Sequence, residues 1–188
     1  MKSHTKYITF LSLLSTLAFI SVSFIRLPLI PSAPFLKFDI RDAIILIGGI
    51  LYDPFAAVIV AFIAGLMQFL LLSDGSGIVG FLMNFISTVS FVCPASFIYK
   101  FGKNYKSLVI GLILGCALMM FNMLLWNYII TPLFMGVPRE AVKAMLLPVF
   151  LPFNILKGLI NSVITFIFFK PLILAANAMN FYEIKKGL

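Results

Sequence analysis

The chain has 188 residues, of which 62% are hydrophobic and only 11% are charged. A soluble domain carries about a quarter charged residues, so this composition excludes an ordinary soluble protein and indicates that lipid covers much of the surface. The net charge of +8 does not indicate nucleic acid binding, because the basic residues are scattered between apolar runs, where they report membrane topology instead.

The first apolar run, residues 7–25, is long enough to cross a bilayer, which takes about 20 apolar residues. It has no small-residue cleavage site, so we interpret it as a retained helix and not a signal peptide. A long loop with prolines and charges follows at residues 26–42. Residues 43–52 are apolar but too few to span alone unless their ends are sheltered, and Asp53 and Pro54 break the chain.

Three further apolar runs predict helices at residues 55–73, 78–99 and 107–132, and a sixth helix is predicted at 146–169. A tight turn at residues 74–77 and a short basic loop at 100–106 join them. The connection 134–145 is polar and has room for a short amphipathic turn. We therefore predict an all-α integral membrane protein of one domain, residues 1–188. It is a bundle of six transmembrane helices with a long outer loop between the first two.

Six passes place both termini on one side of the membrane. The side with the termini carries eight basic residues and the other side five, so the positive-inside rule predicts cytoplasmic termini. The eight are Lys2, Lys6, Lys100, Lys103, Lys106, Lys170, Lys185 and Lys186, and the five are Arg26, Lys37, Arg41, Arg139 and Lys143.

Few polar residues interrupt the apolar runs, and in membrane proteins such residues mark functional sites. Counted at about 1.5 Å per helical residue, Gln68, Asn84, Asn127 and Lys157 all fall in or near the outer third of the membrane. Asn154, Lys157 and Asn161 are spaced i, i+3, i+7 and therefore share one helix face. For Asn122 and Asn161, a structural role is favoured over ligand binding.

Lys157 needs a partner at this depth, where a charge costs on the order of 3 kcal/mol. All six acidic residues fall outside the apolar runs. Lys157 must therefore use backbone carbonyls, Asn side chains, a loop acid that folds inward, or a ligand, and we favour a ligand. Without an acid partner, loss of this charge should stabilise the empty protein. Asn and Lys side chains suit the alternating C=O and N–H groups of a neutral heteroaromatic ring better than a phosphate.

Catalytic interpretations find little support. The sequence contains no Walker A pattern, no HExxH motif and no pair of acids within an apolar run. Cys93 and Cys116 lie in apolar runs without metal-ligand spacing and are interpreted as packing residues. We predict no enzyme, no bound metal and no cofactor, and a carrier so poor in ionisable groups needs an energy source on another chain.

Five segments resemble one known family, the substrate-binding S components of energy-coupling factor (ECF) vitamin transporters, and within it the riboflavin-specific members. The most specific of them is Pro152-Phe153-Asn154-Ile155-Leu156-Lys157-Gly158. The others are Phe38-Asp39-Ile40-Arg41-Asp42, Tyr52-Asp53-Pro54-Phe55-Ala56-Ala57, the Asp74-Gly75 turn with Asn84-Phe85, and Asn127-Tyr128 ahead of Pro132-Leu133.

The resemblance implies a multi-pass protein of a bacterial cell membrane that binds riboflavin, with FMN as a further candidate substrate. It assigns Asn127, Asn154 and Lys157 to the flavin ring. Asn84 and Asp39 complete the predicted substrate-binding set, and the first outer loop is expected to close over the site. The implied partners are a membrane coupling subunit and an ATPase pair.

Ser12 and Thr16 occupy the spacing at which the family's first helix carries small residues, usually Ala, that pack on the coupling subunit. Small residues still permit close approach of helices. Two alternatives remain open: the same architecture serving another vitamin, such as thiamine, and a membrane enzyme or channel. A cationic vitamin would favour an acidic pocket residue, and the apolar runs contain none.

Overall fold

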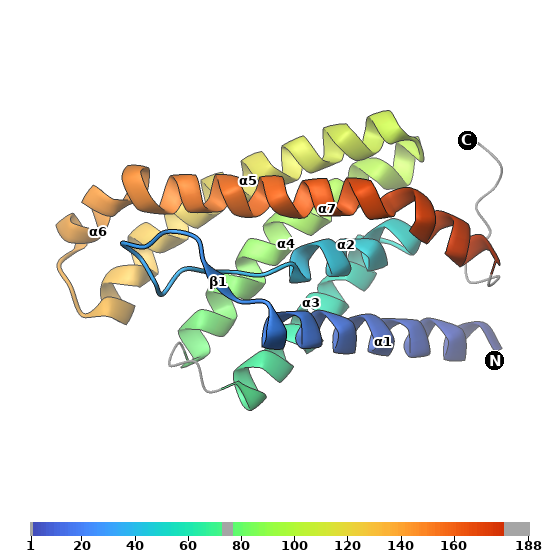
Figure 1. Ribbon diagram of the computed structural model, residues 1–188, viewed down its shortest axis with the longest axis horizontal. Coiled ribbons are helices and arrows are strands. Elements are labelled where there is room, and N and C mark those ends of the chain that lie inside the picture. Colours follow the sequence, from blue (N-terminus) through green and yellow to red (C-terminus); the bar gives the residue numbers. More distant parts are fainter. Residues whose placement is uncertain (1, 73–76, 179–188) are drawn as a thin grey trace.

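The computed structural model describes residues 2–72 and 77–178, and it is almost entirely helical (Figure 1). The long helices are α1 (Lys2–Phe24), α3 (Pro54–Leu71), α4 (Gly77–Gly102), α5 (Tyr105–Met135) and α7 (Leu151–Ala178). The shorter elements are α2 (Arg41–Leu51), α6 (Arg139–Met145), a π-helical turn (Leu146–Phe150) and the strands β1 (Leu27–Pro28) and β2 (Lys37–Phe38).

Among the described residues, five helical segments are long and apolar enough to cross a membrane, which confirms the predicted multi-pass helical bundle. The remaining predicted pass is α2, whose 11 residues span only about 16 Å at 1.5 Å per residue. Both of its ends are sheltered, because Arg41 and Leu51 are buried. The structure thus places a short helix inside the bundle, where the unpaired backbone groups at its ends do not contact lipid.

The predicted chain breaks coincide with helix caps. The Asp53 side chain accepts a hydrogen bond from the Ala56 backbone N–H at 2.8 Å, and Pro54 occupies the first turn, where a missing N–H costs nothing. Asn104 and Ser107 form a reciprocal capping box at the start of α5. The turn predicted at residues 74–77 lies outside the described residues, apart from Gly77.

The start of α1 and the end of α7 lie at the same end of the bundle (Figure 1), as an even number of passes requires. Helices α4 and α5 form a tightly packed antiparallel pair. A Cβ atom at Gly111 would lie 2.7 Å from the carbonyl oxygen of Ala95, so only glycine permits this approach.

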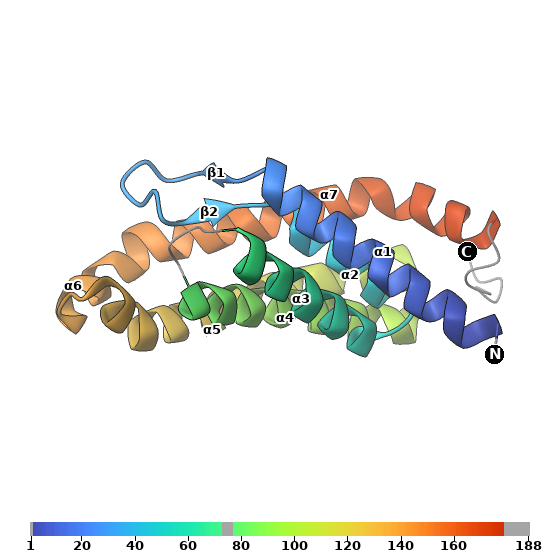
Figure 2. The same cartoon turned by 90° about the horizontal axis from the view of Figure 1, so that it is seen from below.

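The loop predicted between the first two helices is a small antiparallel hairpin in which Leu27 pairs with Phe38. Figure 2 shows this hairpin reaching over the bundle toward α6, at the end opposite the start of α1. Its backbone pairing gives the loop a defined shape above the helices. We call residues 26–40 the lid segment.

The last helix begins later than predicted. The sequence predicted a helix from residue 146, whereas residues 146–150 form a π-helical turn and the α-helix starts at Leu151. Pro148 and Pro152 cannot donate backbone hydrogen bonds, which disfavours a regular α-helix here. Such turns occur frequently at functional sites, and this one precedes Asn154 and Lys157 directly.

Candidate functional site

A cavity of about 460 Å³ lies between the lid segment and helices α4, α5 and α7. This volume falls in the usual range for small-molecule sites, about 300–1,000 Å³. Helical periodicity brings one face of each helix to the cavity: Gly80, Asn84 and Ser87 from α4, Met123, Asn127, Thr131 and Phe134 from α5, and Phe153, Asn154 and Lys157 from α7. Pro34, Phe35 and Leu36 of the lid segment supply apolar contacts from above.

All five residues predicted to bind substrate line this one cavity. Asn127, Asn154, Lys157 and Asp39 are buried in the fold, and Asn84 is half-buried. They come from four different elements that are far apart in the sequence. Apolar walls with a few convergent polar groups are typical of a site for a largely apolar molecule with one polar edge.

The two cavity asparagines are held by their own helices. The Asn127 side chain donates from Nδ2 to the Met123 carbonyl at 2.6 Å and accepts a hydrogen bond from Thr131 at 2.9 Å. Asn154 donates from Nδ2 to the Phe150 carbonyl at 2.7 Å. In the described part of the chain its Oδ1 has no hydrogen-bond partner, so this oxygen can accept a donor from a ligand.

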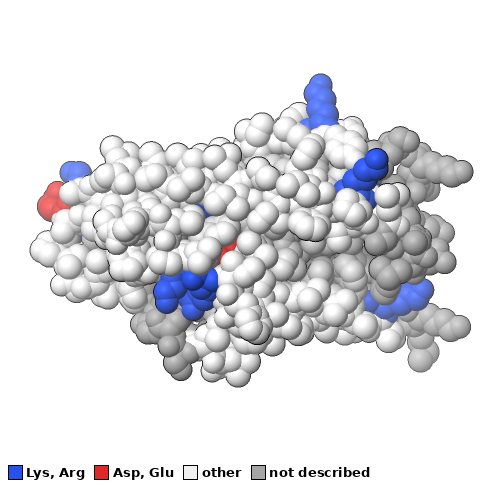
Figure 3. All heavy atoms as spheres, in the orientation of Figure 1, with Lys and Arg blue, Asp and Glu red and all other residues white. Residues whose placement is uncertain are grey.

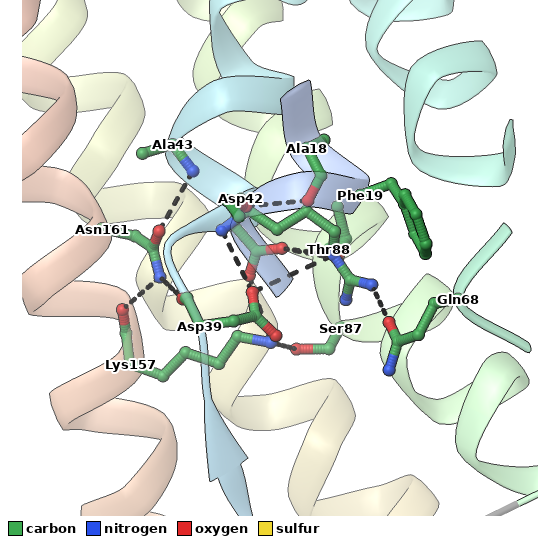
Figure 4. A network of polar contacts seen from close by, with 12 residues as sticks. Ala18, Phe19, Asp39, Asp42, Ala43, Gln68, Ser87, Thr88, Lys157 and Asn161 are labelled. Carbon is green, nitrogen blue, oxygen red and sulfur yellow. Dashed lines mark hydrogen bonds and ion pairs between the residues drawn. The ribbon is translucent and has the colours of Figure 1, made fainter. Parts of the chain in front are cut away.

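Lys157 is paired with a buried acid. Its Nζ lies 3.2 Å from Oδ2 of Asp42 and 3.4 Å from the Ser87 hydroxyl (Figure 4). Of the partners left open by the sequence, an acid folding inward is therefore the one observed, and the idea that Lys157 lacks a buried acid is wrong. Asp42 reaches Lys157 because it lies in the first turn of α2, which enters the bundle.

Asp42 belongs to a larger polar cluster. The Thr88 hydroxyl donates to Asp42 Oδ1 at 2.6 Å, and Arg41 Nε lies 3.9 Å from Asp42 and 4.0 Å from Asp39. Arg41 also donates to the Gln68 side chain. With Lys157, the cluster holds two acids and two bases, all at most 3% exposed. Their charges offset one another, so the free-energy cost of burying each charge stays low only while every member is present.

Three polar residues of the apolar runs serve the fold and do not line the cavity. Asn161 accepts a hydrogen bond from the Ala43 N–H at 3.0 Å and donates to the Asp39 carbonyl at 3.2 Å, so it anchors the start of α2. Asn122 donates to the Ser90 hydroxyl on α4. Both residues make structural contacts of the kind predicted for them, whereas Gln68, placed with the outer polar group, contacts Arg41 instead of the cavity.

Sequence reasoning missed Arg41, Asp42, Ser87 and Thr88. The signal available was the position of Asp42 directly before the apolar run of α2, without a polar spacer. An acid so placed either caps the helix in water or enters the protein with it. Within residues 2–72 and 77–178, no three His, Cys, Asp or Glu side chains gather in a way that could hold a metal ion.

The predicted partner-contact residues lie away from the cavity. Ser12 and Thr16 are exposed on α1, and the Thr16 hydroxyl donates to the Ser12 carbonyl at 2.9 Å. That bond engages the Thr16 hydroxyl, and both side chains are small, so the pair presents a patch of little bulk. Such a patch suits close packing by another helix.

Known proteins resemble this chain over most of its length. Riboflavin transporter RibU of Streptococcus thermophilus is 31% identical over 178 residues, covering 90% of this chain and 84% of the relative. Riboflavin transporter FmnP of Bacillus subtilis is 30% identical, covering 85% and 87%. RibU of Staphylococcus aureus is 32% identical, covering 92% of each chain.

Comparison of the fold with solved structures points to the same family. A solved structure described as the S component of a bacterial ECF transporter superposes with a TM-score of 0.80 at 30% identity, covering 92% of this chain and 98% of its own. The family model for the substrate-specific component of ECF transporters matches residues 6–169. The chain therefore belongs to the family of substrate-specific components of ECF transporters.

Proposed function

We propose that this chain binds riboflavin from outside the cell and delivers it for uptake as the substrate-specific subunit of an ECF transporter. The observation that carries the proposal is that one cavity gathers Asp39, Asn84, Asn127, Asn154 and Lys157. Three relatives named as riboflavin transporters, each about 30% identical over most of the chain, support the same substrate.

The polar edge of the flavin ring matches the cavity's polar groups. The unpaired Asn154 Oδ1 accepts a hydrogen bond from a ring N–H. Lys157 Nζ and the Asn127 amide nitrogen donate hydrogen bonds to ring carbonyls. Met123, Phe153 and Phe134 pack against the ring faces, and the polar side chains of Asp39 in the lid segment and Asn84 on α4 hold the ribityl chain. FMN remains a second candidate substrate.

The proposed transport function needs an external source of energy. An ATPase pair acting through a membrane coupling subunit supplies it, and the exposed pair Ser12 and Thr16 on α1 forms part of the contact with the coupling subunit. The chain itself acts as a carrier and not as an enzyme. Its place is the bacterial cell membrane.

Both termini lie in the cytoplasm in this proposal. The basic residues favour the side with the termini by eight to five. The lid segment and the cavity then face the outside, where vitamin is captured. A reporter enzyme fused after Leu188 should be active only inside the cell, and activity only outside would reverse the orientation.

A cationic vitamin such as thiamine fits the cavity less well. One acidic residue, Asp39, lines it, and Arg41 lies 4.0 Å from that carboxylate. Three basic residues, Arg26, Lys37 and Lys157, line the same cavity. A positively charged ring would therefore meet an excess of positive charge.

The test is purification followed by visible absorption spectroscopy and titration. Protein purified from riboflavin-containing medium should carry bound flavin, and stripped protein should quench riboflavin fluorescence at one site per chain. Thiamine in large excess should not compete. Saturable thiamine binding without flavin binding would overturn the assignment.

A further inference from the structure

A second cavity, of about 440 Å³, lies between α5 and α7 on the surface of the bundle. It shares no lining residue with the substrate cavity, and its walls are apolar side chains such as Val109, Ile113, Val163 and Ile167. Its polar atoms satisfy each other, because the Cys116 thiol and the Ser162 hydroxyl lie 3.4 Å apart. We call this cavity the α5–α7 groove.

Two close contacts hold α5 and α7 together along the groove. A Cβ atom at Gly158 would lie 2.8 Å from Cys116 Sγ, so glycine lets α7 pack directly onto α5 at this point. Near the start of α5, the Tyr105 ring packs against the rings of Phe166 and Phe169, with centroids 6.1 and 5.2 Å away. Exposed apolar side chains of both helices, such as Ile113 and Val163, flank the groove, and the small side chain of Ala117 leaves space along it.

The groove has the length of one lipid leaflet. From Val109 to Met120, the α5 wall rises roughly 16 Å at 1.5 Å per residue. Half of a hydrocarbon core of about 30 Å is about 15 Å. An acyl chain lying along the groove would therefore reach from the interface to the middle of the bilayer.

Both walls continue into a lysine at the same end. Lys106 precedes Val109 by three residues and Ile113 by seven, and Lys170 follows Ile167 by three and Val163 by seven. These spacings place each lysine on the groove-lining face of its helix. Both are exposed, and the Tyr105–Phe169 contact shows that the start of α5 lies beside this part of α7.

The surroundings of these lysines favour an anion. Between residues 77 and 178 the only acidic residue is Glu140, in the first turn of α6 at the opposite end of the bundle, and Asp53, between α2 and α3, is engaged in capping α3. Figure 3 shows a largely uncharged face, with several Lys and Arg side chains toward the end that bears the start of α1. Basic groups at the mouth of a groove between transmembrane helices are a recurring arrangement for anionic lipid headgroups.

We propose that the α5–α7 groove binds one anionic phospholipid, with an acyl chain along the groove and the phosphate between Lys106 and Lys170. An apolar helix of a partner protein would fill the groove without needing either lysine. Charge complementarity therefore favours lipid over protein as the occupant. The proposal depends on membrane insertion and is independent of which vitamin the other cavity binds.

The test uses the full-length purified protein and native mass spectrometry, with phosphatidylglycerol and phosphatidylcholine as probes. One phosphatidylglycerol per chain should be retained in preference to phosphatidylcholine. Lys106→Gln/Lys170→Gln should weaken phosphatidylglycerol retention roughly tenfold or more, because this variant removes both positive charges that attract the lipid phosphate. The control Lys6→Gln/Lys100→Gln removes two exposed lysines from the same end and should change retention less than twofold.

A groove-filling variant separates chain binding from surface charge. Ala117→Phe should reduce phosphatidylglycerol retention while both lysines remain. Equal retention of the two lipids, or an equal loss in the lysine variant and its control, would overturn the proposal. The proposal would also be overturned if Ala117→Phe disrupts dimers, or the binding of the coupling subunit, while phosphatidylglycerol retention stays unchanged. Riboflavin fluorescence quenching should be normal in every variant, which keeps this test separate from that of the proposed function.

Discussion

The Nζ of Lys157 lies 3.2 Å from Oδ2 of Asp42, and both side chains are almost completely buried. The pair joins α7, which lines the substrate cavity, to the short helix α2, which follows the lid segment. A ligand that contacts Lys157 therefore also acts on an ion pair that holds α2 in place. The pair connects one wall of the cavity to the helix that follows the lid segment.

Replacing one partner of this pair should destabilise the empty protein. Lys157→Met leaves Asp42 buried without its closest cation, and breaking a buried pair costs about 3–5 kcal/mol. The expectation from sequence alone, that losing this charge would stabilise the protein, is therefore reversed. Thermal unfolding in detergent should show a lower midpoint for Lys157→Met and for Asp42→Asn. The double variant should recover part of the loss, and a raised midpoint in Lys157→Met would contradict the reversal.

Loss of the Asn154 amide should weaken riboflavin binding. A neutral hydrogen bond contributes about 1 kcal/mol, so Asn154→Leu should raise Kd roughly fivefold, whereas Lys157→Met should raise it about tenfold to a hundredfold. Fluorescence quenching on purified variants measures both. The matched control is Asn122→Leu, because Asn122 contacts Ser90 outside the cavity. A larger effect in the control than in Asn154→Leu would place the site elsewhere.

The lid segment should become less accessible when riboflavin binds. Leu36 is half-buried and lines the cavity, whereas Ser32 is exposed and does not line it. In a background with Cys93 and Cys116 replaced by Ala, maleimide labelling of Leu36→Cys should slow when riboflavin is added. Labelling of Ser32→Cys should slow less. Unchanged labelling of Leu36→Cys at saturating riboflavin would argue against closure.

Bulk on the exposed patch of α1 should block transport without affecting vitamin capture. Ser12→Leu/Thr16→Leu removes the close approach that small residues permit, so uptake in cells should fall strongly while riboflavin quenching by the purified protein stays normal. Ser23→Leu introduces the same change at another exposed position of α1 and should leave uptake intact. Normal uptake in the double variant would move the partner contact to another surface.

The sequence by itself determined the membrane class, the position of most helices and five of the polar residues around the cavity. These follow from local properties: apolar run length is set by bilayer thickness, and helical periodicity fixes which residues share a face. A polar side chain within an apolar run is costly enough to be noticeable in any sequence. For that reason Asn127, Asn154 and Lys157 could be selected before the fold was known.

Only the tertiary structure decided what neutralises Lys157. Asp42 is 115 positions away in the sequence, and its short helix is too brief to reveal by hydropathy whether it lies inside the bundle or at its edge. Packing of α2 against α4 and α7 brings Asp42 to Lys157 and Thr88, and leaves Gln68 to Arg41. Long-range pairing of this kind depends on how elements pack and not on any local pattern, so the sequence allowed several partners and the fold selected one.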